Sequence, residues 1–161
     1  MNIRQLFDIQ RELDKRIVEN HDLHGEDLVT AKVLALEVEL GELANETRCF
    51  KFWSLKDASP KHMVLEEYVD CLHFILSIGL ESGLDGDDFV VKDNSKDLIE
   101  QFQEMFQKSA TFNKDRTKEN YINLFNTFLS LGKKLGFTWD EIQKAYLMKN
   151  EINHQRQDEG Y

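Results

Sequence analysis

Hydrophobic residues recur at three- and four-residue steps along most of the chain, which is the spacing of one face of an α-helix. In the first such segment, residues 3–20, the apolar face comprises Leu6, Ile9, Leu13 and Ile17. Similar patterns predict further helices over residues 28–47, 60–82, 95–109, 116–135 and 139–156. No segment alternates apolar and polar side chains convincingly, as a half-buried strand would. The sequence therefore predicts an all-α fold of about six helices with a four-helix-bundle-like core.

Residues at the ends of the predicted segments support these boundaries. Ser59 and Pro60 predict an N-cap followed by proline at the first helical position. Thr138 and Glu141 have the spacing of a capping box, which places the start of the last helix near residue 139. Gly83 is the residue type that commonly ends a helix, so we expect the third helix to stop there.

Two acidic residues interrupt the apolar pattern of the third predicted helix. The helix over residues 60–82 is apolar nearly all round in its second half, which is the pattern of a buried helix. Glu67 and Asp70 nevertheless lie on the same helix face as the apolar residues Met63 and Phe74. An ionised carboxylate in such a position costs several kcal/mol unless a partner compensates it. A bound metal ion is the simplest such partner.

A second acidic pair, Glu39 and Glu42, lies in the helix predicted over residues 28–47. Residues three apart share a helix face, so each pair can direct two carboxylates to one point. A single pair of this kind is also the ordinary pattern of a solvated helix edge. Two pairs on neighbouring helices would concentrate four negative charges, and hard divalent cations such as Mg²⁺ prefer oxygen ligands of this type.

Length and composition limit the remaining possibilities. With 161 residues, one proline and eight glycines, the chain is most simply one helical domain over residues 1–161. A net charge of −10 argues against binding a nucleic-acid polymer. No apolar run approaches the roughly 20 residues of a membrane span, and no signal peptide is evident. Two cysteines without a disulfide or zinc spacing suggest a reducing cytoplasm.

These residues together carry a family resemblance. The chain resembles the all-α nucleoside triphosphate pyrophosphatases, the MazG-like superfamily, in one spaced set of carboxylates: Glu39-x-x-Glu42 followed by Glu67-x-x-Asp70. Within that superfamily it is most similar to the dimeric dUTPases, through three further segments: Gln10-x-x-Leu13-Asp14, residues 41–54 and residues 145–161. The resemblance spans nearly the whole chain.

The resemblance implies a reaction and a cofactor. Members of the family convert dUTP and water to dUMP and pyrophosphate, some also accept dUDP, and Mg²⁺ is required, with Mn²⁺ as a substitute. The four carboxylates would ligate the metal ions, with catalytic roles for Glu39 and Glu42. Glu42 would orient the water that attacks the β-phosphorus. The family also implies a homodimer whose sites can take residues from the second subunit, so the last helix is a candidate to act in trans.

The base pocket implied by the resemblance would contain Gln10, Asn45 and Trp53. Uracil recognition needs amide-type partners for the carbonyl and N–H groups and an aromatic wall, and these three side chains supply both. From the residues alone, Trp53 fits equally well as a core side chain and Gln10 as an exposed glutamine.

Polar and cationic side chains recur at helical spacing near the C-terminus. The stripe consists of Tyr146, Lys149, Asn150, Asn153, Arg156 and Gln157. Two cations with amides between them suit a phosphate chain and a sugar hydroxyl, so these residues are candidates for substrate binding. Without the resemblance, a solvated helix end explains the same pattern.

Three alternative functions remain at this stage. One is a pyrophosphatase of broader specificity, acting for instance on dCTP. A second is a ferritin-like di-iron protein, because Asp70-x-x-His73 and Glu151-x-x-His154 resemble its carboxylate–histidine motifs. The third is a non-catalytic helical adaptor, which would account for the helices and the acidity but not for the buried acids.

Overall fold

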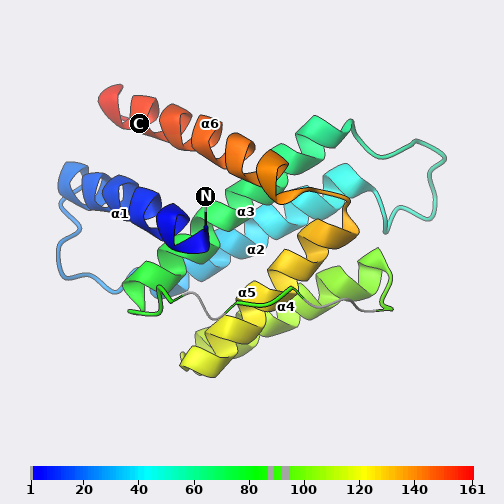
Figure 1. The fold of residues 1–161 in the computed structure, drawn as a ribbon, viewed down its shortest axis with the longest axis horizontal. Coiled ribbons are helices and arrows are strands. Elements are labelled where there is room, and N and C mark those ends of the chain that lie inside the picture. The colour runs from blue at the N-terminus through cyan, green and yellow to red at the C-terminus, as the bar shows by residue number, and fades with distance from the viewer. Residues whose placement is uncertain (1, 87–88, 92–94) are drawn as a thin grey trace.

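The computed structural model describes residues 2–86, 89–91 and 95–161, and this part of the chain contains six helices and no strand (Figure 1). The helices are α1 (Ile3–Asn20), α2 (Val29–Thr47), α3 (Lys61–Glu81), α4 (Leu98–Lys114), α5 (Lys118–Lys134) and α6 (Trp139–Asp158). The all-α prediction is therefore confirmed. Over the described ranges, no helix combines the length and apolar character needed to cross a membrane.

Helix α3 lies at the centre of the fold and packs against α1, α2, α5 and α6 (Figure 1). On one side, α2, α3, α5 and α4 contact one another in a closed ring, which forms the four-helix core. On the other side, α1 and α6 pack against each other and against α3. This arrangement explains why the sequence of α3 is apolar nearly all round, since α3 has helices on two opposite sides.

The contact between α3 and α5 depends on two glycines. Tyr121 of α5 donates a hydrogen bond to a backbone carbonyl of α3 (2.9 Å), where its ring lies against Gly79. Tyr68 of α3 donates in the same way to a carbonyl of α5 (3.2 Å), against Gly132. A methyl group on either glycine would collide with the tyrosine hydroxyl that faces it. The two helices can therefore approach closely only because both positions lack a side chain.

The start of α3 differs from the prediction. Pro60 is the N-cap residue, with non-helical backbone angles, and no side chain caps the helix. The predicted cap by Ser59 is therefore wrong. The backbone N–H of Ser59 instead donates to the carbonyl of Glu46 near the end of α2 (3.0 Å). This bond ties the connector between α2 and α3 back to the helix that it leaves.

Helix α4 is shifted towards the C-terminus relative to the predicted range 95–109. It begins after Asp97, whose side chain forms a capping box with Glu100. It continues to Lys114 because Phe112 extends the buried face of the helix by one more turn. At α6, the predicted capping box between Thr138 and Glu141 is present.

Candidate active site

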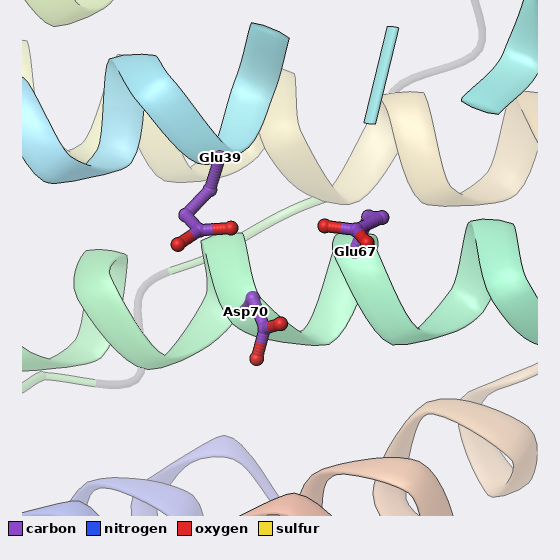
Figure 2. A group of neighbouring side chains, drawn as sticks. All are labelled: Glu39, Glu67 and Asp70. Carbon is purple, nitrogen blue, oxygen red and sulfur yellow. The ribbon is translucent and has the colours of Figure 1, made fainter. Parts of the chain in front are cut away.

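Two neighbouring helices bring three carboxylates together. Glu39 projects from α2, while Glu67 and Asp70 project from α3 (Figure 2). One oxygen from each carboxylate lies within 4.8 Å of one from each of the other two. All three side chains are partly buried. The predicted convergence of acids from two helices is therefore present for these three residues.

Burial and the proximity of the three acids make their charged forms unfavourable. Burial, followed by the charges of Asp70, Glu42 and Glu67, raises the pKa of Glu39 to about 7. Burial is also the main cause that raises the pKa of Glu67 and of Asp70. A cation bound among these groups would relieve both the desolvation and the mutual repulsion.

The ligand types in this group fit a hard divalent cation. All three ligands are carboxylates, which Mg²⁺ and related ions prefer. Within the described residues, neither His73 nor His154 belongs to the group, so the carboxylate–histidine arrangement of a di-iron site does not form. Glu42 is exposed on α2, one turn beyond Glu39, and lies outside the group of three. Its charge still raises the pKa of both Glu39 and Glu67.

A cavity of about 400 Å³ extends from the carboxylates between α1, α2, α3 and α6. Glu39 and Asp70 line one part of it, together with Lys149 and Arg156. The rest is lined by polar and apolar side chains of α1, α2 and α3, which include Gln10, Leu13, Asp14, Lys32, His73, Phe74 and Ser77. A volume of this size suits a small ligand such as a nucleoside. The cavity therefore joins an acidic group to a partly apolar pocket.

Comparison with known proteins identifies the family. A family model described as dUTPase matches residues 2–161, which is nearly the whole chain. The chain belongs to the dUTPase family. Within it, the match is to the all-α dimeric dUTPases. Membership of the dUTPases makes the chain a hydrolase of the nucleoside triphosphate diphosphatase class. A search of curated proteins found no match.

Four of the predicted residues on α6 line the cavity: Lys149, Asn153, Arg156 and Gln157. Lys149 donates a hydrogen bond to Asp70 (2.7 Å) and lies 3.5 Å from Glu66. The cationic stripe of α6 thus faces the acidic group of the same chain. Polar contacts hold this part of α6 against α1, among them an ion pair between Arg16 and Asp158.

Gln10 is buried, with 3% of its surface exposed, so the alternative of an exposed glutamine is wrong. Its Oε1 accepts hydrogen bonds from the Tyr146 hydroxyl (2.8 Å) and from Nδ1 of His73 (2.7 Å). Tyr146 is fully buried, and its ring stacks on His73 with centroids 4.2 Å apart. Gln10 therefore lines the cavity, whereas Tyr146 is not among its lining residues and packs behind the wall, against His73.

Asn45 and Trp53 are not among the described residues that line the cavity. Asn45 is exposed near the end of α2. Trp53 is 65% exposed and packs edge-on against Phe52, with ring centroids 5.0 Å apart. Arg48 holds this connector in shape by donating to the Ser54 hydroxyl (2.6 Å). The reading of Trp53 as a core side chain is therefore wrong, and its role in a base pocket stays a prediction.

Sequence reasoning missed a group of polar residues in the cavity wall. It considered His73 only as part of a di-iron motif, and it gave no role to Lys32 or Ser77. The structure places all three on the cavity, where Asp14 connects Ser77 and Lys32 to Gln10. One signal was present in the sequence, because His73 and Ser77 are polar residues one turn apart in an otherwise apolar helix.

Proposed function

We propose that this protein is a Mg²⁺-dependent dUTP diphosphatase that converts dUTP and water to dUMP and pyrophosphate. Membership of the dUTPase family supports the reaction class. The observation that carries the proposal is the continuity of the cavity from Glu39 and Asp70 to Gln10 and His73. A triphosphate at the acidic end and a base at the polar end would fill the two chemically different parts of one cavity.

Glu39, Glu67 and Asp70 would hold the divalent ions at the phosphate end, and Glu42 lies close enough to contribute from the rim. Bound ions would neutralise phosphate oxygens and lower the pKa of the attacking water. The exposed carboxylate of Glu42 would orient that water for attack on the β-phosphorus. Because Glu42 lies at the edge of the carboxylate group and is open to solvent, a role in orienting water suits it better than a purely structural role.

Side chains of α6 would hold the phosphate chain and the sugar. Lys149 and Arg156 line the cavity beside the carboxylates and offer cationic donors for phosphate oxygens. Asn153 and Gln157 lie on the same helix face and offer amide groups suited to a sugar hydroxyl. Because Lys149 contacts Asp70 of its own chain, α6 can serve the site in cis.

The aromatic connector supports the proposal that the protein acts as a homodimer. Phe52, Trp53 and Leu55 are 94%, 65% and 105% exposed, and Arg48 holds the segment in a defined shape. Large apolar side chains rarely stay exposed in a group unless they meet a partner. In a homodimer, this segment would cover the open side of a nucleotide cavity and bring Trp53 to the base.

The deciding experiment measures pyrophosphate release from dUTP, dCTP, dTTP and UTP, with Mg²⁺ and with EDTA. The proposal predicts Mg²⁺-dependent turnover confined to dUTP. Glu39→Gln should abolish this turnover, whereas the matched variant Glu46→Gln, which lies two turns along α2 and outside the carboxylate group, should keep it. Turnover of several nucleotides would instead identify a pyrophosphatase of broader specificity, and turnover in EDTA would contradict the metal site.

A further inference from the structure

Lys149 of α6 lies between two acids of α3 that are one helical turn apart. Its ammonium group donates a hydrogen bond to Asp70 (2.7 Å) and lies 3.5 Å from a carboxylate oxygen of Glu66. Asp70 and Lys149 line the cavity and are largely buried, whereas Glu66 is exposed and is not among the described residues that line it. The ammonium group therefore has an inner acidic partner, Asp70, and an outer one, Glu66.

The two acidic partners differ in what a bound divalent ion would do to them. Asp70 belongs to the group of three carboxylates, and Glu66 does not. An ion held by that group would neutralise Asp70 and repel the ammonium group of Lys149. Glu66 lies outside the group and would keep its charge. Of the two acids that contact Lys149 within the described residues, Glu66 is then the one that can hold it.

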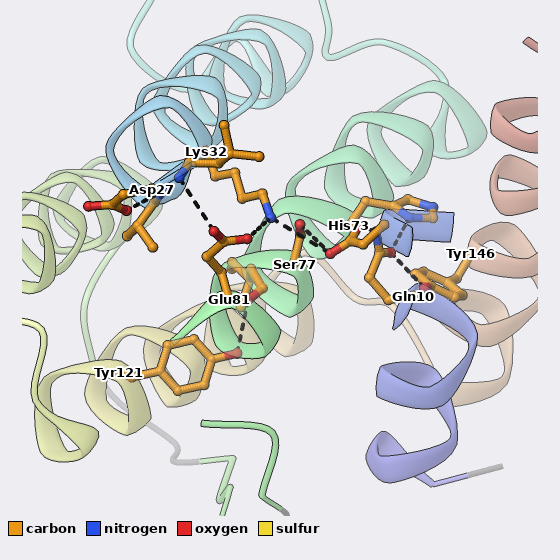
Figure 3. Close-up of polar contacts among 12 residues, drawn as sticks. Gln10, Asp27, Lys32, His73, Ser77, Glu81, Tyr121 and Tyr146 are labelled. Carbon is orange, nitrogen blue, oxygen red and sulfur yellow. Dashed lines mark hydrogen bonds and ion pairs between the residues drawn. The ribbon is translucent and has the colours of Figure 1, made fainter. Parts of the chain in front are cut away.

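A second lysine of the cavity, Lys32, shows which partner a lysine takes when its inner acid is already engaged. Its inner acid is Asp14, which lines the cavity and accepts hydrogen bonds from Ser77 (2.6 Å) and Gln10 (2.7 Å). Lys32 lies 3.8 Å from Asp14 but forms a 2.7 Å ion pair with the outer acid, Glu81 (Figure 3). An inner acid with other partners thus leaves its lysine to the outer acid.

We propose that Glu66 is a positioning residue for the phosphate end of the site, which takes over Lys149 when a divalent ion binds to Asp70. This inference rests on the proposed function, in which Lys149 binds phosphate oxygens. Without Glu66, Lys149 would lose its acidic partner when metal and phosphate bind together. Held by Glu66, the ammonium group stays beside the cavity and has donors left for a phosphate oxygen, because it carries three.

The change of partner can be followed without any reaction by NMR of ¹⁵N-labelled lysine ammonium groups. An ammonium group held in an ion pair exchanges its hydrogens with water more slowly than a free one, so its signal persists. The Lys149 signal is assigned by its loss in Lys149→Gln, and it should persist in the wild type with and without Mg²⁺. In Glu66→Gln it should persist without Mg²⁺, because Asp70 holds Lys149, and disappear at saturating Mg²⁺.

The consequence for binding is measured by calorimetry with pyrophosphate at saturating Mg²⁺. Removal of an acid close to an anion normally strengthens binding of that anion. The proposal predicts the opposite sign, because Glu66→Gln should bind pyrophosphate about threefold more weakly, as expected for loss of an exposed ion pair. In the Lys149→Gln background, Glu66→Gln should cause no loss, since no ammonium group is left to position.

Glu151→Gln is the matched control for both measurements. It removes the same charge from an exposed residue of α6 that is two positions from Lys149 and therefore on another face of the helix. In this variant the Lys149 signal should persist at saturating Mg²⁺, and pyrophosphate should bind no more weakly than in the wild type.

Unchanged or tighter pyrophosphate binding in Glu66→Gln would overturn the proposal, and so would an equal loss in the Lys149→Gln background. A Lys149 signal that persists in Glu66→Gln at saturating Mg²⁺ would overturn it as well. These outcomes are separate from a failure of the proposed function. If they are as expected but dUTP is not hydrolysed, the function fails and the role of Glu66 towards metal and phosphate stands. If dUTP is hydrolysed and Glu66→Gln binds pyrophosphate as the wild type does, the inference alone fails.

Discussion

Lys149 of α6 donates a hydrogen bond to Asp70 of α3 across 2.7 Å, so a protein ammonium group sits on one of the three candidate metal ligands. Burial opposes the charged form of Lys149, but the hydrogen bond and charge of Asp70, together with the charge of Glu66, outweigh burial and raise the pKa of Lys149. The same bond partly offsets the effect of burial on Asp70. Lys149 therefore supplies part of the positive charge that the carboxylate group needs.

Replacing Lys149 should separate metal binding from substrate binding. In Lys149→Gln, we expect Mn²⁺ to bind the ligand-free protein roughly tenfold more tightly, because the competing ammonium group is gone. Pyrophosphate should bind less well, because one cation of the phosphate end is lost. Calorimetry measures both affinities. Lys144→Gln removes an exposed charge from the same helix and serves as the control. Weaker Mn²⁺ binding in Lys149→Gln would show that Lys149 does not compete with the metal.

The stabilising effect of Mg²⁺ should grow with pH. The pKa of Glu39 is raised from 4.5 to about 7, so the metal-free fold favours the protonated form. This group therefore contributes stability that is fully present below pH 4.5 and is lost as the pH rises through about 7. Bound Mg²⁺ requires the ionised form. The increase in Tm on adding Mg²⁺ should be larger about one pH unit above that value than about one unit below it. Thermal melts across this range test the prediction, and a pH-independent increase would contradict it.

Adding one methyl group between α3 and α5 should destabilise the core. Gly132→Ala places a Cβ against the hydroxyl of Tyr68, and overpacking of this kind costs about 1–3 kcal/mol. Gly41→Ala is the matched control, because Gly41 lies inside α2 with nothing near its Cβ position. That change should stabilise the fold by roughly 0.5–1 kcal/mol. Urea unfolding gives both values, and equal effects of the two substitutions would mean that α3 and α5 adjust freely.

Trp53 should report on nucleotide binding without contributing to the fold. Because the side chain is 65% exposed, Trp53→Ala should change the free energy of unfolding by only about 0.5 kcal/mol. If the connector covers a nucleotide cavity, the affinity for dUMP should fall by roughly tenfold or more. Nucleotide should also change the tryptophan emission of the wild type, and Trp53→Phe should lack that change. A dUMP affinity that is unaffected by Trp53→Ala would exclude this residue from the site.

The acidic group was predictable because it breaks a pattern. Glu67 and Asp70 occupy apolar positions in a helix that the sequence marks as buried, and Glu39 lies on a neighbouring helix with a second pair. Helical periodicity places Glu67 and Asp70 on one face of α3, and the packing of α2 against α3 brings Glu39 to them. The helix ends were less predictable where packing decides them, as at Phe112, whose burial extends α4 beyond the predicted end.

The polar contacts that link Asp14 to His73 through Gln10 were not predictable in the same way. Each of these residues is a single polar side chain in its helix. Their contacts depend on how far α1 is shifted along its axis relative to α3, and the residue spacing within one helix does not determine that shift. The connector posed a different difficulty, because its aromatic residues have no helical period. Composition alone could not distinguish a core position for Trp53 from the exposed one that it has.

The two walls of the cavity differ in how firmly they are anchored. The acidic wall belongs to α3, whose apolar side chains are buried on both sides. In α6, no residue after Asn150 is buried, and polar contacts join this half of the helix to α1, such as the hydrogen bond from Asn20 to Gln157 (3.2 Å). Moving this half of α6 away from α1 would expose no core to water. Under the proposed function, nucleotide would enter and leave by exchanging these polar contacts for water, while the three carboxylates keep their places.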